Sequence, residues 1–429
     1  MGWQEIQRLD ERGDDPRGGM PPQSRSQRTL RRHDGADFRR GIAAPVAPYH
    51  GRVRFQLHED RDKRPARRDA RLHARPGSGD QPTRKVLRVC DRWHASAPNQ
   101  TWPNRFFVHT GTAAGYVNNS PVRFPYLMPT IFNRLTQRQR SWRVYFHDVP
   151  LTATLSNILS ELPERLYPFE DAFMSDAMAG RLPDYSFIEP RYFPSIVFNR
   201  MPNDQHPPHN VAYGERLIAR CYDALRNSPG WEHTLFIVIY DEHGGVYDHV
   251  PPPEAVLPDD ACPDGFRFDR YGVRVPAVLI SPWIPAGSIV RPPAGSQYPF
   301  DHASILSTLR KLFDLGDPLT RRDAAAPDLL AALSLTSPSN SGPASLAFPT
   351  AAPSADEIAS AHRAPPNDLQ QAILQLASAL PTGSAALATH LDLLDSAKEQ
   401  LAVTQCATVG DVLLQVEKGF SRFLRTPRL

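Results

Sequence analysis

One stretch, residues 234–253 (TLFIVIYDEHGGVYDHVPPP), constrains the fold of this chain more than any other. Its beginning, residues 235–240, is an unbroken apolar run of mostly β-branched and aromatic side chains, which is typical of a strand buried on both faces in a parallel sheet. Asp241 and Glu242 follow that run directly. Open α/β sheets bind ligands beyond the carboxyl ends of their strands. The stretch therefore predicts an α/β fold with a polar site where this strand ends.

The residues after the strand are dense in ionisable side chains. His243, a Gly-Gly pair, Asp248 and His249 follow the two carboxylates. A lone Asp-Glu pair is most simply an ordinary turn, because turns are rich in Asp. Two histidines and a second Asp close by instead favour a functional site. Adjacent carboxylates at a strand end are suitable ligands for one divalent metal ion.

The composition excludes several classes of protein. A chain of 429 residues is long enough for two or three domains, and a net charge of +3 gives no bulk attraction to nucleic acid. The four cysteines have no CxxC spacing, which argues against a disulfide scaffold or a thiolate zinc site. No run approaches the roughly 18 apolar residues of a transmembrane segment, and the N-terminus lacks a signal peptide's apolar core. Without a signal peptide, the chain as given is expected in the cytoplasm, and its actual localisation is unknown.

The first 85 residues differ from everything after them. They contain 18 arginines beside many Asp, Gly and Pro residues, without sustained apolar periodicity. Such a composition buries too little apolar surface to offset chain entropy, so we expect range 1–85 to be disordered or poorly packed. The alternative is a basic arm that binds nucleic acid or anionic lipid. The acidic residues interspersed among the arginines argue against that alternative.

A second chemical stretch is TWPNR, residues 101–105. Pro103 suits the first turn of a helix, and the apolar residues that follow supply a buried face. Thr101 is then expected at a helix N-terminus, where free N–H groups and the helix dipole favour an anion. A hydroxyl group in that position, close to a cation, can ionise and attack phosphorus. The alternative is a capping threonine with no chemistry.

The rest of the chain alternates strand and helix patterns, which supports an α/β class with a mainly parallel central sheet flanked by helices. Strands are expected at 141–146, 185–190 and 273–280, and helices at 155–162, 210–227 and 300–313. Three histidines fall beside these elements: His147 after a strand, His206 in a proline-braced loop, and His302 at a helix start. His302 is equally compatible with the surface and with the site.

The C-terminal third has a different character. Residues 335–367 are rich in Ser, Pro and Ala and are predicted to be a linker. Residues 368–429 are predicted to be helical, and an apolar stripe runs through 409–423. Packing against the catalytic domain, expected at 86–334, explains that stripe, and membrane association is the alternative.

Together, YDEHGGVYDHVPPP, the upstream His-Pro-Pro loop and CDRWHAS…TWPNRFF resemble the bacterial phosphoesterase family. That family contains the non-haemolytic phospholipases C and the AcpA-type acid phosphatases, within the alkaline phosphatase superfamily. The resemblance runs from about Val86 to about Asp323. It implies an alkaline phosphatase-like α/β core with a helical C-terminal segment, and hydrolysis of phosphate esters, including phospholipid head groups. Members of the family are often exported.

The resemblance also implies roles for individual residues. Thr101 would be the nucleophile and would form a phospho-threonine intermediate. Asp241, Glu242 and Thr101 would bind one divalent metal ion of unknown identity. His206 would protonate the leaving group. The weaker candidates for contacting phosphate oxygens are Asn104, His147 and His243.

One family feature is missing from the sequence. Family members begin with a strand that ends in a Glu-Asn-Arg-Ser-Phe-Asp-His type motif, whose Glu and Asn complete the metal site, and no such motif occurs here. The abrupt change of composition near Val86 suggests a shifted reading frame or a wrongly chosen start. An inactive, truncated relative is therefore the alternative function. A sulfatase is a further alternative, which the absence of Cys or Ser at position 101 argues against.

Overall fold

The computed structural model describes residues 88–121, 124–340, 342–347, 352–380 and 406–424. All of them belong to one compact unit, His50–Leu429. The Arg-rich range 1–85 and its predicted disorder lie outside the described residues. The predicted domain boundaries at 86, 335 and 368 stay predictions.

The strands of the described residues form two sheets. A four-stranded sheet has the order β5-β6-β1-β7, and a three-stranded sheet has the order β3-β2-β4. The bounds are β1 Arg88–Cys90, β2 Trp142–Phe146, β3 Leu166–Pro168, β4 Tyr185–Glu189, β5 Phe236–Ile239, β6 Ala277–Ile280 and β7 Ile289–Val290. The α/β class predicted from the sequence is confirmed.

The strand pairing adds detail that the sequence did not indicate. Strand β2 pairs in parallel with β3 and β4, and β1 pairs in parallel with β7. Strand β6, in contrast, is antiparallel to both β5 and β1. Parallel pairs thus predominate, but the strands do not form a single sheet. Because β5 is at one end of its sheet in the described chain, its four residues are half-buried rather than buried on both faces as expected.

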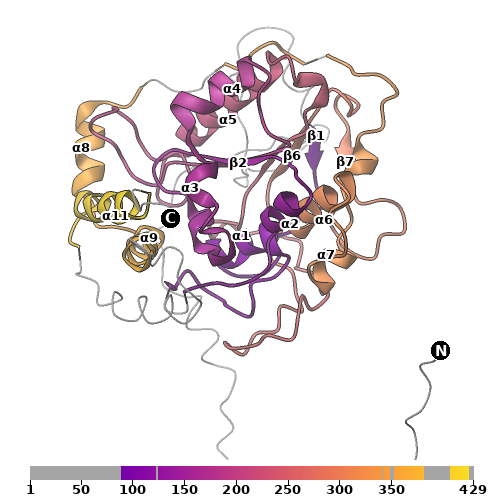
Figure 1. Cartoon of the computed structure of the whole chain (residues 1–429), viewed down its shortest axis with the longest axis horizontal. Coiled ribbons are helices and arrows are strands. Elements are labelled where there is room, and N and C mark those ends of the chain that lie inside the picture. Colours follow the sequence, from indigo (N-terminus) through magenta and orange to yellow (C-terminus); the bar gives the residue numbers. More distant parts are fainter. Residues whose placement is uncertain (1–87, 122–123, 341, 348–351, 381–405, 425–429) are drawn as a thin grey trace, which may run out of the picture. The chain divides into compact units, whose positions relative to one another are not determined.

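One group of helices packs around α1. Helix α1 (Thr101–Thr110) contacts α2 (Ile131–Gln137) and α6 (Ala303–Leu312), and α6 contacts α7 (Arg321–Ala325) (Figure 1). Helix α1 ends at Gly111, whose φ of 72° is in the left-handed region that favours glycine. A β-carbon there would also lie 2.6 Å from Thr320 Oγ1, so the close approach of α7 requires glycine.

A second group of helices packs against side chains of β2 and β6. Helix α5 (Val211–Arg226) contacts α4 (Met174–Met178), and both contribute to a buried cluster with Tyr145, Val278 and Ile280. Asn210 caps α5 as predicted, because its side-chain oxygen accepts a hydrogen bond of 3.1 Å from the Ala212 N–H. Two short helical segments complete this part, η5 Phe169–Phe173 and η6 Trp231–His233, whereas η7 Leu330–Ala332 packs against the other core cluster.

The helix predicted at 155–162 is wrong. The chain there forms the 3₁₀ segments η3 (Leu151–Thr154) and η4 (Ser156–Ile158), followed by the single-turn helix α3 (Leu162–Arg165). Leu155 separates the two 3₁₀ segments because its backbone is extended and pairs with Tyr126. The Ser156 N–H donates to the Tyr126 carbonyl at 2.9 Å. A tertiary contact therefore overrides the local helix pattern.

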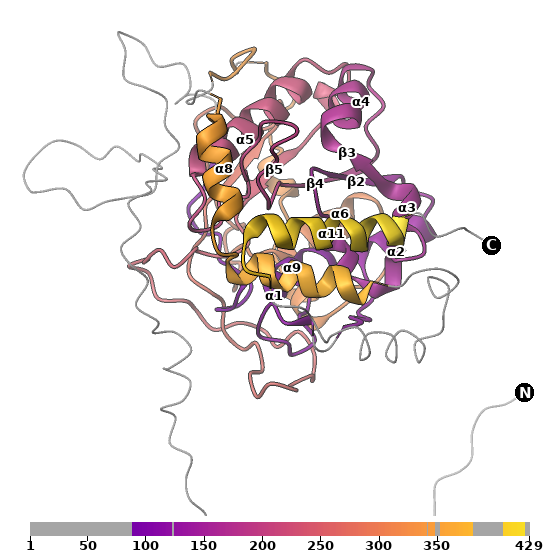
Figure 2. The same cartoon turned by 90° about the vertical axis from the view of Figure 1, so that its left-hand side faces the viewer.

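The C-terminal helices pack on one another (Figure 2). They are α8 (Ala355–Arg363), α9 (Asp368–Ala379) and α11 (Val409–Leu424). Helix α8 falls within 335–367, where a linker was predicted. The apolar stripe of α11 is buried, which confirms packing as its role. None of the helices described is long and apolar enough to cross a bilayer.

Candidate active site

The two carboxylates lie directly beyond the carboxyl end of β5, as predicted. The Asp241 side chain accepts a hydrogen bond of 3.0 Å from the Glu242 N–H, and Glu242 accepts one of 2.8 Å from the Gly244 N–H. Burial raises the pKa of Asp241, and Arg105, followed by His206, opposes that rise. Burial and the neighbouring Asp241 raise the pKa of Glu242 to about 7. The two side chains are half-buried, and a carboxylate pair of this kind attracts cations.

His302 lies in this site, which resolves the alternative that the sequence left open. Its side chain is fully buried, and its Nε2 lies 2.7 Å from the Asp241 carbonyl oxygen. A carbonyl can only accept, so Nε2 carries the proton. Nδ1 then accepts from Trp93 Nε1 at 3.3 Å. The imidazole is held as one neutral tautomer, and burial lowers its pKa.

Thr101 is the first residue of α1 and is 5% exposed. The preceding residue, Gln100, is extended and makes no side-chain cap, although its amide oxygen accepts from the Asn119 N–H at 2.9 Å. Asn119 in turn accepts from the Trp102 N–H at 2.7 Å. The helix start that carries Thr101 is thus fixed by its neighbours. The prediction that a helix begins there is confirmed, and the catalytic role of Thr101 stays a prediction.

Arg105 connects the helix of Thr101 to both sheets. It follows Thr101 by one helical turn and donates a short, charge-assisted hydrogen bond to Glu189 at the end of β4. Glu189 is fully buried and also accepts from the Thr152 N–H at 3.0 Å and the Tyr192 hydroxyl at 3.1 Å. The charge of Arg105 acts on Asp241 as well. Sequence reasoning missed Glu189, although its place at a strand end was the available signal.

The Asn104 side chain is hydrogen-bonded to the backbone of the loop before α1. Its amide oxygen accepts from the Ala97 N–H at 2.9 Å, and its amide nitrogen donates to the carbonyls of Ala97, Asn99 and Gln100 at 2.9–3.2 Å. The side chain is fully buried. Its contacts in the structure are therefore those of a scaffold residue. Phosphate binding by Asn104 stays a prediction without support from this geometry.

The His206 loop approaches the carboxylates. Pro207 lies against Gly244, where an added β-carbon would be 3.4 Å from the proline ring. The Tyr240 hydroxyl at the end of β5 donates a short hydrogen bond to Gln205. His206 itself acts electrostatically on Asp241. The structure thus brings His206 to the candidate site, as the resemblance implies.

The two other histidines behave differently. His147 is half-buried, with its Nδ1 2.8 Å from the Glu189 carbonyl and its ring stacked on Phe169. Burial lowers the pKa of His147 to about 4, so the ring is neutral near pH 7. His243 is exposed, and its Nδ1 lies 3.1 Å from the Val246 carbonyl. None of these interactions involves the side chain of Asp241 or Glu242.

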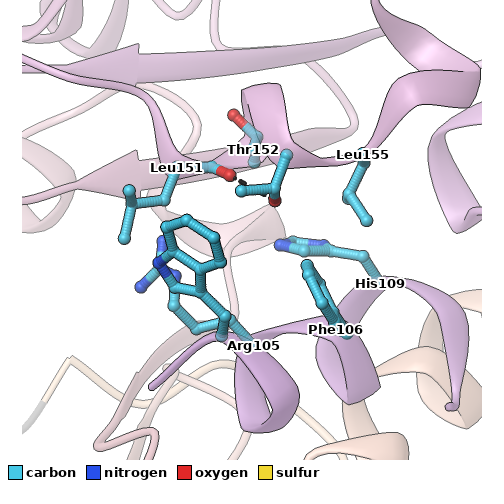
Figure 3. A pocket seen from close by; sticks show the side chains of 8 residues that line it. Arg105, Phe106, His109, Leu151, Thr152 and Leu155 are labelled. Carbon is cyan, nitrogen blue, oxygen red and sulfur yellow. Dashed lines mark hydrogen bonds between the residues drawn. The ribbon is translucent and has the colours of Figure 1, made fainter. Parts of the chain in front are cut away.

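The cavity shown in Figure 3 lies on another face of α1. It is lined by Trp102, Arg105, Phe106, His109, Leu151, Thr152, Thr154 and Leu155. Thr101, Asp241 and Glu242 are not among these residues. Trp102 Nε1, Thr152 Oγ1 and both ring nitrogens of His109 have no hydrogen-bond partner among the described residues. Buried water would satisfy such atoms.

Two adjacent, half-buried carboxylates with raised pKa values fit a divalent metal ion in charge and in donor type. Within the described residues, however, no group of three or more His, Cys, Asp or Glu side chains is placed to hold a metal. Asp241 and Glu242 would therefore supply only part of the ligands that such an ion needs.

The α/β fold carries a half-buried carboxylate pair on which Arg105 of α1 acts, and the chain matches a known family. The Phosphoesterase family model matches residues 85–316, more than half of the chain, and the chain belongs to that family. It is 40% identical over 271 residues to non-specific phospholipase C3 of Arabidopsis thaliana, covering 60% of this chain and 51% of that protein. Identity to non-specific phospholipase C1 of the same plant is 42% over 253 residues, covering 56% and 46%.

A bacterial relative is more distant. The non-hemolytic phospholipase C of Pseudomonas aeruginosa is 29% identical over 302 residues, covering 59% of this chain and 41% of that protein. The chain spans about half the length of the curated relatives it matches. An alkaline phosphatase superfamily protein from Vibrio parahaemolyticus aligns with 58% of this chain and 62% of its own, at 14% identity and a TM-score of 0.34.

Proposed function

We propose that this chain hydrolyses phosphate esters at the Asp241–Glu242 pair. The observation that carries the proposal is a pair of half-buried carboxylates at the end of β5, with Arg105, one turn after Thr101, acting on Asp241. Membership of the Phosphoesterase family and relatives named phospholipase C support it. Phosphodiesters of the phospholipase C type are the first candidate substrates, and phosphomonoesters are the second.

In the proposed reaction, the Thr101 hydroxyl releases its proton to water and Oγ1 attacks phosphorus; the bond to the leaving oxygen breaks, which leaves a phospho-threonine. His206 donates a proton to the departing alkoxide. Water then hydrolyses the phospho-threonine and restores Thr101. Arg105 and Glu189 hold the helix start against the strand ends. A divalent ion bound by Asp241, Glu242 and Thr101 would lower the pKa of the threonine hydroxyl and offset charge on the phosphoryl group.

The alternative is an inactive relative. It is favoured by the incomplete donor set: the described residues place fewer than three His, Cys, Asp or Glu ligands together. Divalent ions usually take about six oxygen ligands, so two carboxylates alone would bind one weakly. In that case the fold would persist without turnover.

The test is hydrolysis of p-nitrophenylphosphorylcholine and p-nitrophenyl phosphate by the purified chain, with added divalent ions and with chelator. We expect turnover that chelator removes, and Thr101→Ala should lower kcat by a factor on the order of 10³ or more. Thr101→Ser, which keeps a hydroxyl group, is the matched control and should retain measurable turnover. Equal rates for the parent chain and Thr101→Ala would remove the nucleophile from the proposal. No turnover by the parent chain would favour the inactive relative.

A further inference from the structure

Large apolar side chains are exposed on two loops. Ile196, Val197 and Phe198 form the tip of the loop between β4 and α5 and are 63%, 86% and 68% exposed. Val246 and Tyr247 follow the carboxylate pair and are 59% and 86% exposed. These five make up half of the large apolar side chains that are exposed in the described residues. Soluble proteins usually leave such side chains scattered, and a concentration of them marks an interaction surface.

The first loop is held in shape by its own backbone. Ser195 and Arg200 exchange two backbone hydrogen bonds, of 2.8 and 3.0 Å, directly below the apolar tip. At its base the Asn203 N–H donates to the Arg191 carbonyl at 2.9 Å, and the Asn203 side chain accepts from the Arg191 N–H at 2.5 Å. The three apolar side chains are therefore presented to solvent by a braced turn. Their exposure is a property of this hydrogen-bonded turn and not of an unstructured loop.

The second loop is anchored in a similar way. It starts at Glu242 and is closed by Asp248, which accepts from Arg274 at 2.8 and 2.9 Å. Its base meets the chain that leaves the first loop, because Gly244 packs against Pro207. The two apolar tips thus project from segments that meet beside the candidate active site.

The charges around the tips select the kind of partner. Residues 194–203 contain the exposed Arg200 and no acidic residue. The second loop begins at Glu242, which belongs to the candidate site, and its other acidic residue, Asp248, is paired with Arg274. Apolar tips beside an exposed arginine, with no acidic residue within either tip, suit a bilayer that contains anionic lipid.

We propose that these two loops insert their apolar tips into a phospholipid surface and thereby dock the candidate active site on it. This inference rests on the proposed function, the hydrolysis of phosphate esters at the candidate site. It adds that these esters come from a lipid surface. A second copy of the chain is the competing occupant. If two copies paired through the first loop, their exposed Arg200 side chains would bring like charges together.

The experiment is co-sedimentation of the full chain with phosphatidylcholine vesicles, with and without phosphatidylserine, in the presence of chelator so that no lipid is turned over. We expect binding that increases with phosphatidylserine. A variant that combines Ile196→Ser, Val197→Ser, Phe198→Ser and Tyr247→Ser should lose about tenfold or more in bound fraction. The matched control combines Met178→Ser and Leu312→Ser, which are 68% and 54% exposed on other elements, and should bind like the parent chain.

Several results would overturn the inference. These are the absence of vesicle binding by the parent chain, equal binding by the loop variant, and a dimer of the parent chain that the loop variant converts to monomer. Hydrolysis of the soluble esters should be the same in parent and loop variant, because the substituted side chains lie outside the candidate site. Loop-dependent vesicle binding without ester hydrolysis would support the docking surface and contradict the proposed function.

Discussion

His109 is a buried histidine on α1 whose two ring nitrogens have no hydrogen-bond partner among the described residues. Burial, followed by the nearby charge of Arg105, lowers its pKa well below 6.5. In the unfolded chain the ring takes up a proton near pH 6.5, whereas in the folded chain it stays neutral to a much lower pH. Acid therefore favours the unfolded state through His109.

Replacing His109 with Phe should remove this acid sensitivity. Relative to the parent chain, we expect the free energy of unfolding of His109→Phe to rise by about 1.4 kcal/mol for each pH unit below 6.5, or about 2 kcal/mol at pH 5. Urea unfolding at several pH values measures the difference. At pH 8 both states hold a neutral ring, so the difference there gives the packing effect alone. A difference that does not change between pH 8 and pH 5 would contradict the prediction.

Asn104 provides a second test at the level of a residue. Because its amide makes four hydrogen bonds that fix the loop before α1, Asn104→Ala should lower the free energy of unfolding by about 2–4 kcal/mol. Denaturant unfolding measures the loss, and the exposed Asn118→Ala is the control, expected within about 0.5 kcal/mol of the parent chain. A residue that only contacted phosphate would lose ligand affinity without loss of stability.

Among the elements, the sequence predicted those whose signals are local. The apolar run before Asp241, Pro103 in the first turn of α1 and the Asn210 cap each lie within the element they define. The Arg105–Glu189 pair could not be predicted, because its members are 84 residues apart and meet only in the folded chain. Leu155 was misassigned for the same reason, since pairing with Tyr126 decides its conformation.

The packing of α11 on α9 gives a prediction at this scale. A β-carbon on Gly419 would lie 2.4 Å from the Ala377 carbonyl oxygen, so Gly419→Ala must push the helices apart. The better helix propensity of Ala, about 1 kcal/mol, opposes an overpacking cost of about 1–3 kcal/mol. We expect a net loss of about 0–2 kcal/mol, measured by thermal unfolding. Leu414→Ala, on the exposed side of α11, is the control; a stabilised Gly419→Ala chain would show that the helices are not in this close contact.

At the scale of the whole molecule, one buried guanidinium connects segments from distant parts of the chain. Arg322 on α7 donates to the carbonyls of Ser96, Val256 and Phe268 at 2.6–2.9 Å and forms an ion pair with Asp301 at 3.4 Å. Both partners of the pair are fully buried. Ser96 also donates to Asp301 at 2.8 Å, and Asp301 is followed by His302 of the candidate site. The connection between α7, the loop before α1 and the start of α6 therefore runs through Arg322.

Arg322→Met should accordingly lower the free energy of unfolding by about 3–5 kcal/mol, because it leaves Asp301 as an uncompensated buried charge. Its neighbour Arg321→Met is a matched control: Arg321 is exposed and pairs with exposed Asp260 at 2.8 Å, so little or no loss of stability is expected from this substitution. Adding Asp301→Asn to Arg322→Met removes the stranded charge and should restore part of the loss, which a double-mutant cycle in urea measures. The contrary result is that Asp301→Asn lowers the free energy of unfolding by the same amount in the Arg322→Met background as in the parent chain. The two residues would then not be coupled, and the three carbonyl contacts would account for the effect of Arg322.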